Sequence, residues 1–358
     1  MQSLRVLVAP TAFKGTLSPR QAAEAIASGI RRTRPHAHIV LLPVADGGDG
    51  FLECLSAEAT LHWNEVTGPL GEQISAPFAL HSDGTAIIES ARCCGVTLVP
   101  AGSLDPMRAT SRGVGELLRE ARAVGASRAL VGLGGSATND GGAGALQGLG
   151  FLLLDDAGTE LGPGGRSLGR LARVVPPKRV DWPEIVCACD VENPLLGPSG
   201  CTAVYGPQKG VRTPEQSELL EAGLARLASL ADFSPDTPRA GAAGGLAFGL
   251  AAFAGAKLLA GSELVLERLR FDERLAECDL VITGEGKLDD QTAQGKVVGE
   301  VLKRARRAGV RLYAVCGVLG PGWEPLKDLL TADPLETRQP QNAAQGVEDA
   351  AAALAERW

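Results

Sequence analysis

The two ends of the chain share a pattern that its middle lacks. Near the N-terminus, the apolar runs LRVLVAP at 4–10 and HIVLLPVA at 38–45 flank a helical pattern. Near the C-terminus, CDLVITGEG at 278–286 and RLYAVCGV at 311–318 flank another helical pattern. Strand–helix–strand units of this kind build parallel sheets with helices on both faces. The two ends together therefore predict one doubly wound α/β domain.

The middle of the chain has a different texture. From 61 to 88, short alternating runs are broken by GPLGE and SDG, which is typical of antiparallel hairpins. A helical pattern over about 111–124 and further strand and helix patterns follow. We therefore expect an inserted mixed α/β domain at 64–268, with 1–63 and 269–358 forming the discontinuous outer domain.

Composition narrows the class of protein. A chain of 358 residues is too long for one ordinary core, and its net charge of −7 argues against a nucleic-acid or anionic-membrane surface. The N-terminus shows no signal-peptide pattern, so we expect a cytoplasmic protein. The longest uncharged stretch, between Arg239 and Lys257, is shorter than a membrane span and predicts a buried helix.

Cysteine and histidine usage excludes several kinds of site. The eight cysteines form no C-x-x-C pair, so we expect buried free thiols rather than a zinc site. The four histidines lie outside every glycine-rich turn. A histidine triad or a histidine metal site is therefore not expected.

Charged side chains follow the predicted strands of the outer domain. The carboxyl ends of parallel strands lie at one edge of a sheet, where ligands bind in such folds. Carboxylates and lysines on these turns suit Mg²⁺ with phosphate, although aspartate and glycine are also plain turn formers and helix caps. The three turns PTAFKGTLS, ADGGDGF and TGEGKLDDQT supply Lys14, Asp46, Asp49, Glu285, Lys287 and Asp289.

A glycine-rich turn, GLGGSATNDGGAG at 132–144, is predicted to join a strand to a helix. Its first six residues fit the dinucleotide pattern G-x-G-x-x-A, and Asp155 and Asp156 lie roughly twenty residues further on. A dehydrogenase that binds NAD is therefore one hypothesis. However, Asp140 in the same turn would repel a pyrophosphate. The chain contains neither a P-loop motif nor the protein-kinase signatures.

Two further features suggest phosphoryl transfer. Asp190 ends the predicted strand EIVCACDV, where its carboxylate could accept a hydroxyl proton or form a simple Asx turn. Four of the eight lysines adjoin a glycine, which suits a point charge that follows a phosphoryl group. These are Lys14, Lys209, Lys287 and Lys296.

Taken together, the motifs resemble those of the type I glycerate kinase family, in the same order along the chain. The resemblance implies a flavodoxin-like domain interrupted by a second α/β domain, with the active site in the cleft between them. It also implies that D-glycerate is phosphorylated by ATP with Mg²⁺, giving 2-phosphoglycerate. The motifs are VAPTAFKGTLSPRQAAEAIASG, PVADGGDGF, TGPLGEQISAPF, GLGGSATNDGGAGALQGLG, ACDVENPLLGPSG, YGPQKG, GAAGGLAFGL and VITGEGKLDDQTAQGKV.

The resemblance assigns candidate roles to particular residues. The candidate catalytic residues are Asp190, Lys14 and Asp46. The candidate ATP- or substrate-binding residues are Gly134, Gly135, Ser136, Thr138, Asn139, Lys209, Glu285, Lys287 and Asp289. The candidate metal ligands are Asp49 and Asp140. Which motif holds ATP, which holds glycerate, and the oligomeric state stay open at this point.

The sequence departs from the family pattern at several positions. Thr11 and Ala12 stand where Asp-Ser is common, which removes a carboxylate and a hydroxyl from the first turn. Asp49 replaces the usual Glu, Phe51 the usual Thr, and Lys287 the usual Arg. The alternatives to a kinase are an NAD-dependent hydroxy-acid dehydrogenase and a metabolite-binding protein without enzyme activity.

Overall fold

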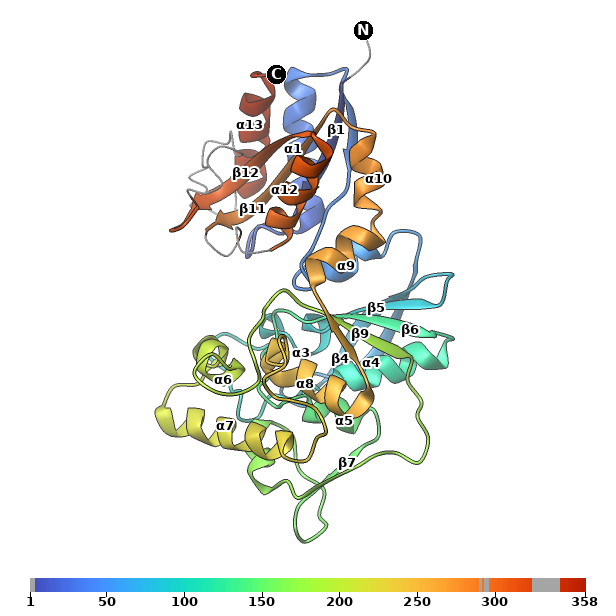
Figure 1. The fold of residues 1–358 in the computed structure, drawn as a ribbon, viewed down its shortest axis with the longest axis vertical. Helices are drawn as coiled ribbons and strands as arrows, with labels where there is room; N and C mark the ends of the chain where they lie inside the picture. The colour runs from blue at the N-terminus through green and yellow to red at the C-terminus, as the bar shows by residue number, and fades with distance from the viewer. Residues whose placement is uncertain (1–3, 290–291, 293–295, 324–341) are drawn as a thin grey trace. The chain divides into compact units, whose positions relative to one another are not determined.

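The computed structural model describes residues 4–289, 292, 296–323 and 342–358. Contacts between Cα atoms divide the chain into two compact units (Figure 1). Unit 1 consists of Met1–Ala57 and Ala260–Trp358, and unit 2 of Glu58–Leu259. Unit 1 is thus built from both ends of the chain, and unit 2 is inserted between them.

Unit 1 contains a four-stranded parallel sheet in the order β12-β11-β1-β2. Numbered along the unit, its strands lie in the order 2-1-3-4, which is the flavodoxin-like order. Chain order reverses between β1 and β11, so the turns at the carboxyl ends of these strands mark the ligand-binding edge. The strands are β1 (Arg5–Pro10), β2 (His38–Leu41), β11 (Leu280–Leu288) and β12 (Arg311–Leu319).

Helices cover the sheet of unit 1. The side chain of Ser18 caps the first of them, as predicted, and Gln21 completes a capping box. Helices α1 and α13 pack together against Val6, Val8 and Ile282 of the sheet (Figure 1). The helices are α1 (Pro19–Thr33), α2 (Phe51–Leu55), α9 (Gly261–Arg268), α10 (Phe271–Ala276), α12 (Val297–Ala308) and α13 (Ala343–Ala355).

One predicted turn of unit 1 is wrong. The glycines of TGEGK suggested that the strand stops there, but β11 continues to Leu288 by pairing with β12 alone. Gly284 permits this continuation, because a Cβ atom on it would lie 2.3 Å from the carbonyl oxygen of Val315. Glu285 and Lys287 therefore lie on a strand, two residues apart and on the same side of it.

Unit 2 contains a mixed six-stranded sheet in the order β10-β9-β6-β5-β4-β3. Strands β10, β9, β6 and β5 are parallel, and β4 and β3 are antiparallel to their neighbours. The hairpins predicted for 61–88 are confirmed as β3, β4 and β5. The strands are β3 (Thr60–Thr67), β4 (Gln73–Leu80), β5 (Thr85–Glu89), β6 (Arg128–Gly132), β9 (Glu184–Ala188) and β10 (Lys257–Leu259), and a separate antiparallel pair is formed by β7 (Leu152–Leu154) and β8 (Arg173–Val175).

The helices of unit 2 include the two patterns expected at 111–124 and in the uncharged stretch. The second of these differs from the prediction, because Ala243, Gly244 and Gly245 begin α8 with positive φ angles instead of helical ones. The α-helices are α3 (Ala91–Cys94), α4 (Arg112–Ala123), α5 (Ala143–Gly148), α6 (Cys201–Tyr205), α7 (Pro214–Ala228) and α8 (Ala242–Ala254). The 3₁₀ helices are η1 (Val96–Leu98), η2 (Gly165–Arg170) and η3 (Pro207–Lys209).

The doubly wound parallel sheet and the inserted mixed α/β unit confirm the predicted fold class. All eight cysteines are free, and all except the half-buried Cys278 are buried, as expected. Among the described residues, no helix is both long enough and apolar enough to cross a membrane.

Candidate active site

A group of carboxylates lies at the ligand-binding edge of unit 1. Glu285 is half-buried on β11, and its Oε1 atom accepts a 2.6 Å hydrogen bond from the hydroxyl of Thr292. Burial raises the pKa of Glu285 to about 7, and the charges of Asp46 and Asp289 act in the same direction. The structure thus brings together Asp46 and Glu285, which the sequence placed in two different turns, with Asp289 from the second of these turns.

Cations and turn geometry complete this group. Lys287 forms a 2.9 Å ion pair with Asp289, and the positive charge of Lys296 opposes the rise in the pKa of Glu285. The carboxylate of Asp46 accepts a hydrogen bond from the amide of Gly48, which forms the Asx turn that the sequence allowed. We call Asp46, Glu285, Asp289 and the lysines Lys287 and Lys296 the carboxylate cluster.

Two other candidates of unit 1 lie outside these contacts. Lys14 and Asp49 are exposed to solvent. The turn that carries Lys14 nevertheless lies against β11, because the amide of Thr11 donates to the carbonyl of Gly284. A Cβ atom on Gly286 would also lie 3.3 Å from the amide nitrogen of Lys14. The backbone of Lys14 is therefore beside the strand that carries Glu285.

In unit 2, the glycine-rich turn joins β6 to α5, as predicted. Its polar side chains face inward: Ser136, Thr138 and Asn139 are all buried. Gly134 is half-buried and Gly135 is exposed, so these two residues form the accessible part of the turn. We call residues 134–141 the glycine loop. A ligand would reach its backbone before its side chains.

The predicted site residue Lys209 is close to this loop. It is only 4% exposed, and its Nζ atom donates to Oγ of Ser136 at 2.9 Å and to the carbonyl oxygen of Thr138 at 2.8 Å. Burial lowers the pKa of Lys209 to about 8. The structure thus shows that Lys209 contacts Ser136 and Thr138, which could not be predicted from the sequence.

Asp140 has a different environment from the one that the metal prediction requires. Its carboxylate is fully buried and accepts hydrogen bonds from the amide and hydroxyl of Ser111 and from the amides of Gly142 and Gly144. Burial raises its pKa, and these hydrogen bonds oppose the rise. Since donors surround both oxygens, Asp140 is better explained as a structural carboxylate than as a metal ligand.

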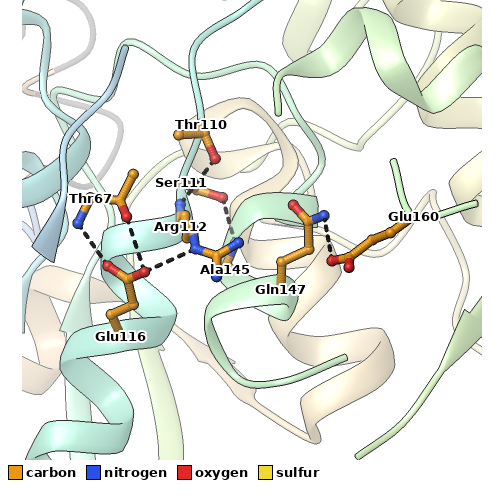
Figure 2. A network of polar contacts seen from close by, with 8 residues as sticks. All are labelled: Thr67, Thr110, Ser111, Arg112, Glu116, Ala145, Gln147 and Glu160. Carbon is orange, nitrogen blue, oxygen red and sulfur yellow. Dashed lines mark hydrogen bonds and ion pairs between the residues drawn. The ribbon is translucent and has the colours of Figure 1, made fainter. Parts of the chain in front are cut away.

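The partner of Asp140 belongs to a larger polar network (Figure 2). Ser111 precedes α4, and its hydroxyl also accepts a hydrogen bond from the amide of Ala145 in α5. One turn further along α4, Glu116 accepts hydrogen bonds from Thr67 and Arg112. Ser111 was not identified from the sequence. Its network fixes the start of α4 and α5, and with them the glycine loop.

Asn139 and Asp190 are the remaining predicted residues of unit 2. The side-chain amide of Asn139 donates to the hydroxyl of Thr202 at 2.9 Å, while its buried Oδ1 atom has no hydrogen-bond partner among the described residues. Asp190 is half-buried and lies two residues beyond the end of β9. Strands β6 and β9 are parallel neighbours, so Asp190 and the glycine loop follow adjacent strands at the same edge of the sheet.

The acidic residue expected for a dinucleotide site is not placed for that role. In a Rossmann unit, this acid ends a neighbouring strand of the same parallel sheet. Asp155 instead follows β7, which pairs only with β8 in the separate two-stranded sheet. Its carboxylate accepts hydrogen bonds from the amides of Ala157 and Thr159 in its own turn. The dehydrogenase hypothesis thereby loses its structural support.

No group of three or more His, Cys, Asp or Glu side chains is arranged to hold a metal ion in the part of the chain that the structure describes. Magnesium is commonly held by one or two carboxylates together with substrate phosphates. The carboxylate cluster fits that chemistry, because the negative charges of Asp46 and Asp289 act on the half-buried carboxylate of Glu285 at this edge of the sheet. Asp140 does not fit it.

Charged groups at the carboxyl ends of parallel strands are typical of α/β enzymes that bind small-molecule substrates. The glycerate kinase family model matches residues 6–357, and the chain belongs to this family. It is 43% identical to the glycerate kinase of Bacillus subtilis (strain 168) over 325 residues, which cover 88% of this chain and 85% of that protein. It is 42% identical to the glycerate 2-kinase of Escherichia coli (strain K12), with 88% and 86% covered.

A solved structure agrees with these relatives. The crystal structure assigned as glycerate kinase 2 from Salmonella typhimurium LT2 matches with a TM-score of 0.82 and 37% sequence identity. The match covers 99% of this chain and 98% of that one. The chain is therefore a kinase, and the resemblance noted from its motifs is confirmed.

Proposed function

We propose that this kinase transfers the γ-phosphoryl group of ATP to the C2 hydroxyl of D-glycerate and releases 2-phosphoglycerate and ADP. Membership of the glycerate kinase family supports the substrate, and the similarity to a glycerate 2-kinase supports the position of the phosphate. The observation that carries the proposal is the carboxylate cluster at the edge of a flavodoxin-like sheet, which suits a metal-bound polyphosphate.

Unit 1 is proposed to bind the nucleotide phosphates. Lys14 and Lys287 are exposed ammonium groups that would neutralise phosphoryl oxygens as the transfer proceeds. One or two of the carboxylates of Asp46, Glu285 and Asp289 would hold Mg²⁺ together with the phosphates, and the exposed Asp49 is a further candidate. When bound, Mg²⁺ would neutralise the negative charge that accumulates on the phosphates.

Unit 2 is proposed to supply the proton acceptor. As the glycerate oxygen bonds to the γ-phosphorus, the bond from that phosphorus to the bridging oxygen breaks, and ADP leaves with its electron pair. The carboxylate of Asp190 accepts the hydroxyl proton. Gly134, Gly135 and Ser136 of the glycine loop contribute backbone amides to bind an anionic group, while Thr138, Asn139 and Lys209 support them from within.

An ADP-release assay tests this proposal. The purified chain should release ADP from ATP and Mg²⁺ when D-glycerate is present, and release should fall to background when D-glycerate is omitted. L-glycerate and glycerol serve as matched acceptors that keep the hydroxyl chemistry but change its stereochemistry or remove the carboxylate. Equal ADP release with and without D-glycerate would contradict the proposed function. A metabolite-binding protein without enzyme activity would bind D-glycerate and release no ADP.

A further inference from the structure

Lys209 is a buried cation with no carboxylate partner. It is 4% exposed, and among the residues that the structure describes its Nζ atom contacts Ser136 and Thr138 and forms no direct ion pair with an aspartate or glutamate. The charge of the buried Asp140 acts on it without a direct contact. Buried charges are normally paired, because removing an ammonium group from water is costly. The unpaired positive charge of Lys209 would be stabilised if an anion bound nearby.

Both hydrogen bonds of Lys209 hold the glycine loop. The hydroxyl of Ser136 accepts one of them and the main-chain carbonyl of Thr138 accepts the other, so Lys209 fixes the backbone as well as a side chain. Further along the loop, the amide of Gly141 donates to the carbonyl of Gly244 at 3.0 Å. The inner half of the loop is therefore held at two separate points.

The outer half of the loop presents unpaired donors. In the described part of the chain, the amides of Gly134, Gly135 and Ser136 donate to no protein acceptor. Gly135 has a φ of 63°, in the left-handed region, and its carbonyl accepts a hydrogen bond from the amide of Val96. Successive free amides around a left-handed residue form a concave site that binds anions.

We propose that Lys209 is a positioning residue that holds Ser136 and Thr138 so that the amides of Gly134, Gly135 and Ser136 bind one oxyanion of the substrates. This inference rests on the proposed function and specifies how Lys209 supports the glycine loop and which groups of the substrates its amides bind. The oxyanion is either the carboxylate of glycerate or a phosphate of ATP, since both present oxygens that accept from amides. Lys209 acts through the loop and adds its positive charge beneath it.

The test compares Lys209→Met with Lys257→Met in steady-state kinetics. Lys257 is an exposed lysine of the same unit that pairs with Glu184, so its replacement controls for the loss of one positive charge. We expect Lys209→Met to raise the KM of one substrate about tenfold or more, with kcat changed by less than about threefold. Lys257→Met should leave both KM values unchanged. A rise in the KM of D-glycerate identifies a carboxylate, and a rise in the KM of ATP identifies a phosphate.

A pH profile separates this role from a purely structural one. Burial lowers the pKa of Lys209 to about 8, and the nearby Cys201, Cys94 and Asp140 oppose this shift. Cys201 does not titrate in the same range, because burial raises its pKa to about 11. In the wild type, the affected KM should therefore rise above about pH 8, and in Lys209→Met it should be raised already and stay flat.

The inference is overturned if both KM values of Lys209→Met match the wild type, or if only kcat falls. If Lys209→Met does not fold, Ser136→Ala tests the inference instead, because it removes one contact of Lys209 and keeps the ammonium group in place. Ser136→Ala should raise the same KM, and unchanged values for both substrates would contradict the inference. Failure of the proposed function is distinct, since the wild type would then release no ADP with D-glycerate.

Discussion

The hydroxyl of Thr292 donates a 2.6 Å hydrogen bond to Oε1 of Glu285 and also accepts one from the amide of Asp289. Thr292 is fully buried, so it ties two carboxylate-bearing positions of unit 1 together from beneath. This contact stabilises the charged form of Glu285, yet burial still raises its pKa to about 7. The balance makes Glu285 sensitive to pH near neutrality.

The stability of unit 1 should therefore depend on the ionisation of Glu285. Its folded-state pKa lies above the usual 4.5, so the folded state binds the proton more tightly than the unfolded state does. The resulting stabilisation is complete below about pH 4.5 and is lost as pH rises through 7. Between pH 5 and 8, the free energy of unfolding should fall by about 2 kcal/mol more in the wild type than in Glu285→Gln. Hydrogen exchange of peptides from β11 measures this difference.

The control for this measurement is Glu277→Gln. Glu277 is exposed and pairs with Arg5 on the surface of the same unit. Its replacement should leave the pH dependence of β11 exchange as in the wild type. Identical pH profiles for Glu285→Gln and the wild type would show that Glu285 does not titrate in this range.

Replacing Asp140 should destabilise unit 2 strongly. Its carboxylate accepts hydrogen bonds from Ser111, Gly142 and Gly144, and Asp140→Ala would leave these buried donors without an acceptor. We expect a loss of about 3–5 kcal/mol in the free energy of unfolding. Urea unfolding followed by the exchange of peptides from α4 and α5 would measure it. Asp156→Ala, which removes an exposed carboxylate, should cost less than about 0.5 kcal/mol.

The left-handed turn at the start of α8 gives a test of close backbone contact. A Cβ atom on Gly244 would lie 2.0 Å from the carbonyl oxygen of Thr138, and the φ of Gly244 is 68°. Gly244→Ala should therefore displace the glycine loop and lower both the melting temperature and kcat/KM. The matched control is Gly255→Ala at the other end of α8, where φ is also positive but no atom lies within 4 Å. It should cost only about 1 kcal/mol of stability and leave kcat/KM unchanged.

The proposed role of Asp190 predicts a loss of turnover without a loss of binding. Asp190→Asn keeps the size of the side chain but cannot accept the hydroxyl proton. We expect kcat to fall about 10²- to 10⁴-fold and the KM of D-glycerate to change by less than about threefold. Asp181→Asn, an exposed position before β9, should behave as the wild type. Wild-type turnover in Asp190→Asn would remove Asp190 from the base role.

Much of the fold follows from local sequence patterns. Apolar runs with flanking helix signals predicted both the parallel sheet of unit 1 and the hairpins of unit 2, because strand and helix periods differ. The errors occur where neighbouring strands override local signals. The glycines near Glu285 suggested a turn, but pairing with β12 extends β11 through them. The left-handed start of α8 exists because Gly244 packs directly against Thr138, which no local pattern reveals.

The residues of the candidate site could be predicted from the sequence only in part. Position after a strand identified Asp46, Glu285 and Asp289, because topology alone brings such residues to one edge. The same criterion also selected Asp140, whose carboxylate turned out to support the loop from inside. Side-chain direction distinguishes these cases, and it depends on partners far along the chain, such as Ser111. Thr292 and Lys296 were missed as site residues for the same reason, although the glycine beside Lys296 drew attention to it.

The most direct test of the central claim is the ³¹P NMR spectrum of the product formed from ATP, Mg²⁺ and D-glycerate. A phosphate on C2 has one proton on the attached carbon and gives a doublet, whereas a phosphate on C3 has two and gives a triplet. We expect ADP and an organic phosphate that gives a doublet, in equal amounts. A triplet would contradict phosphorylation at C2, and the absence of any organic phosphate would contradict glycerate phosphorylation by this kinase.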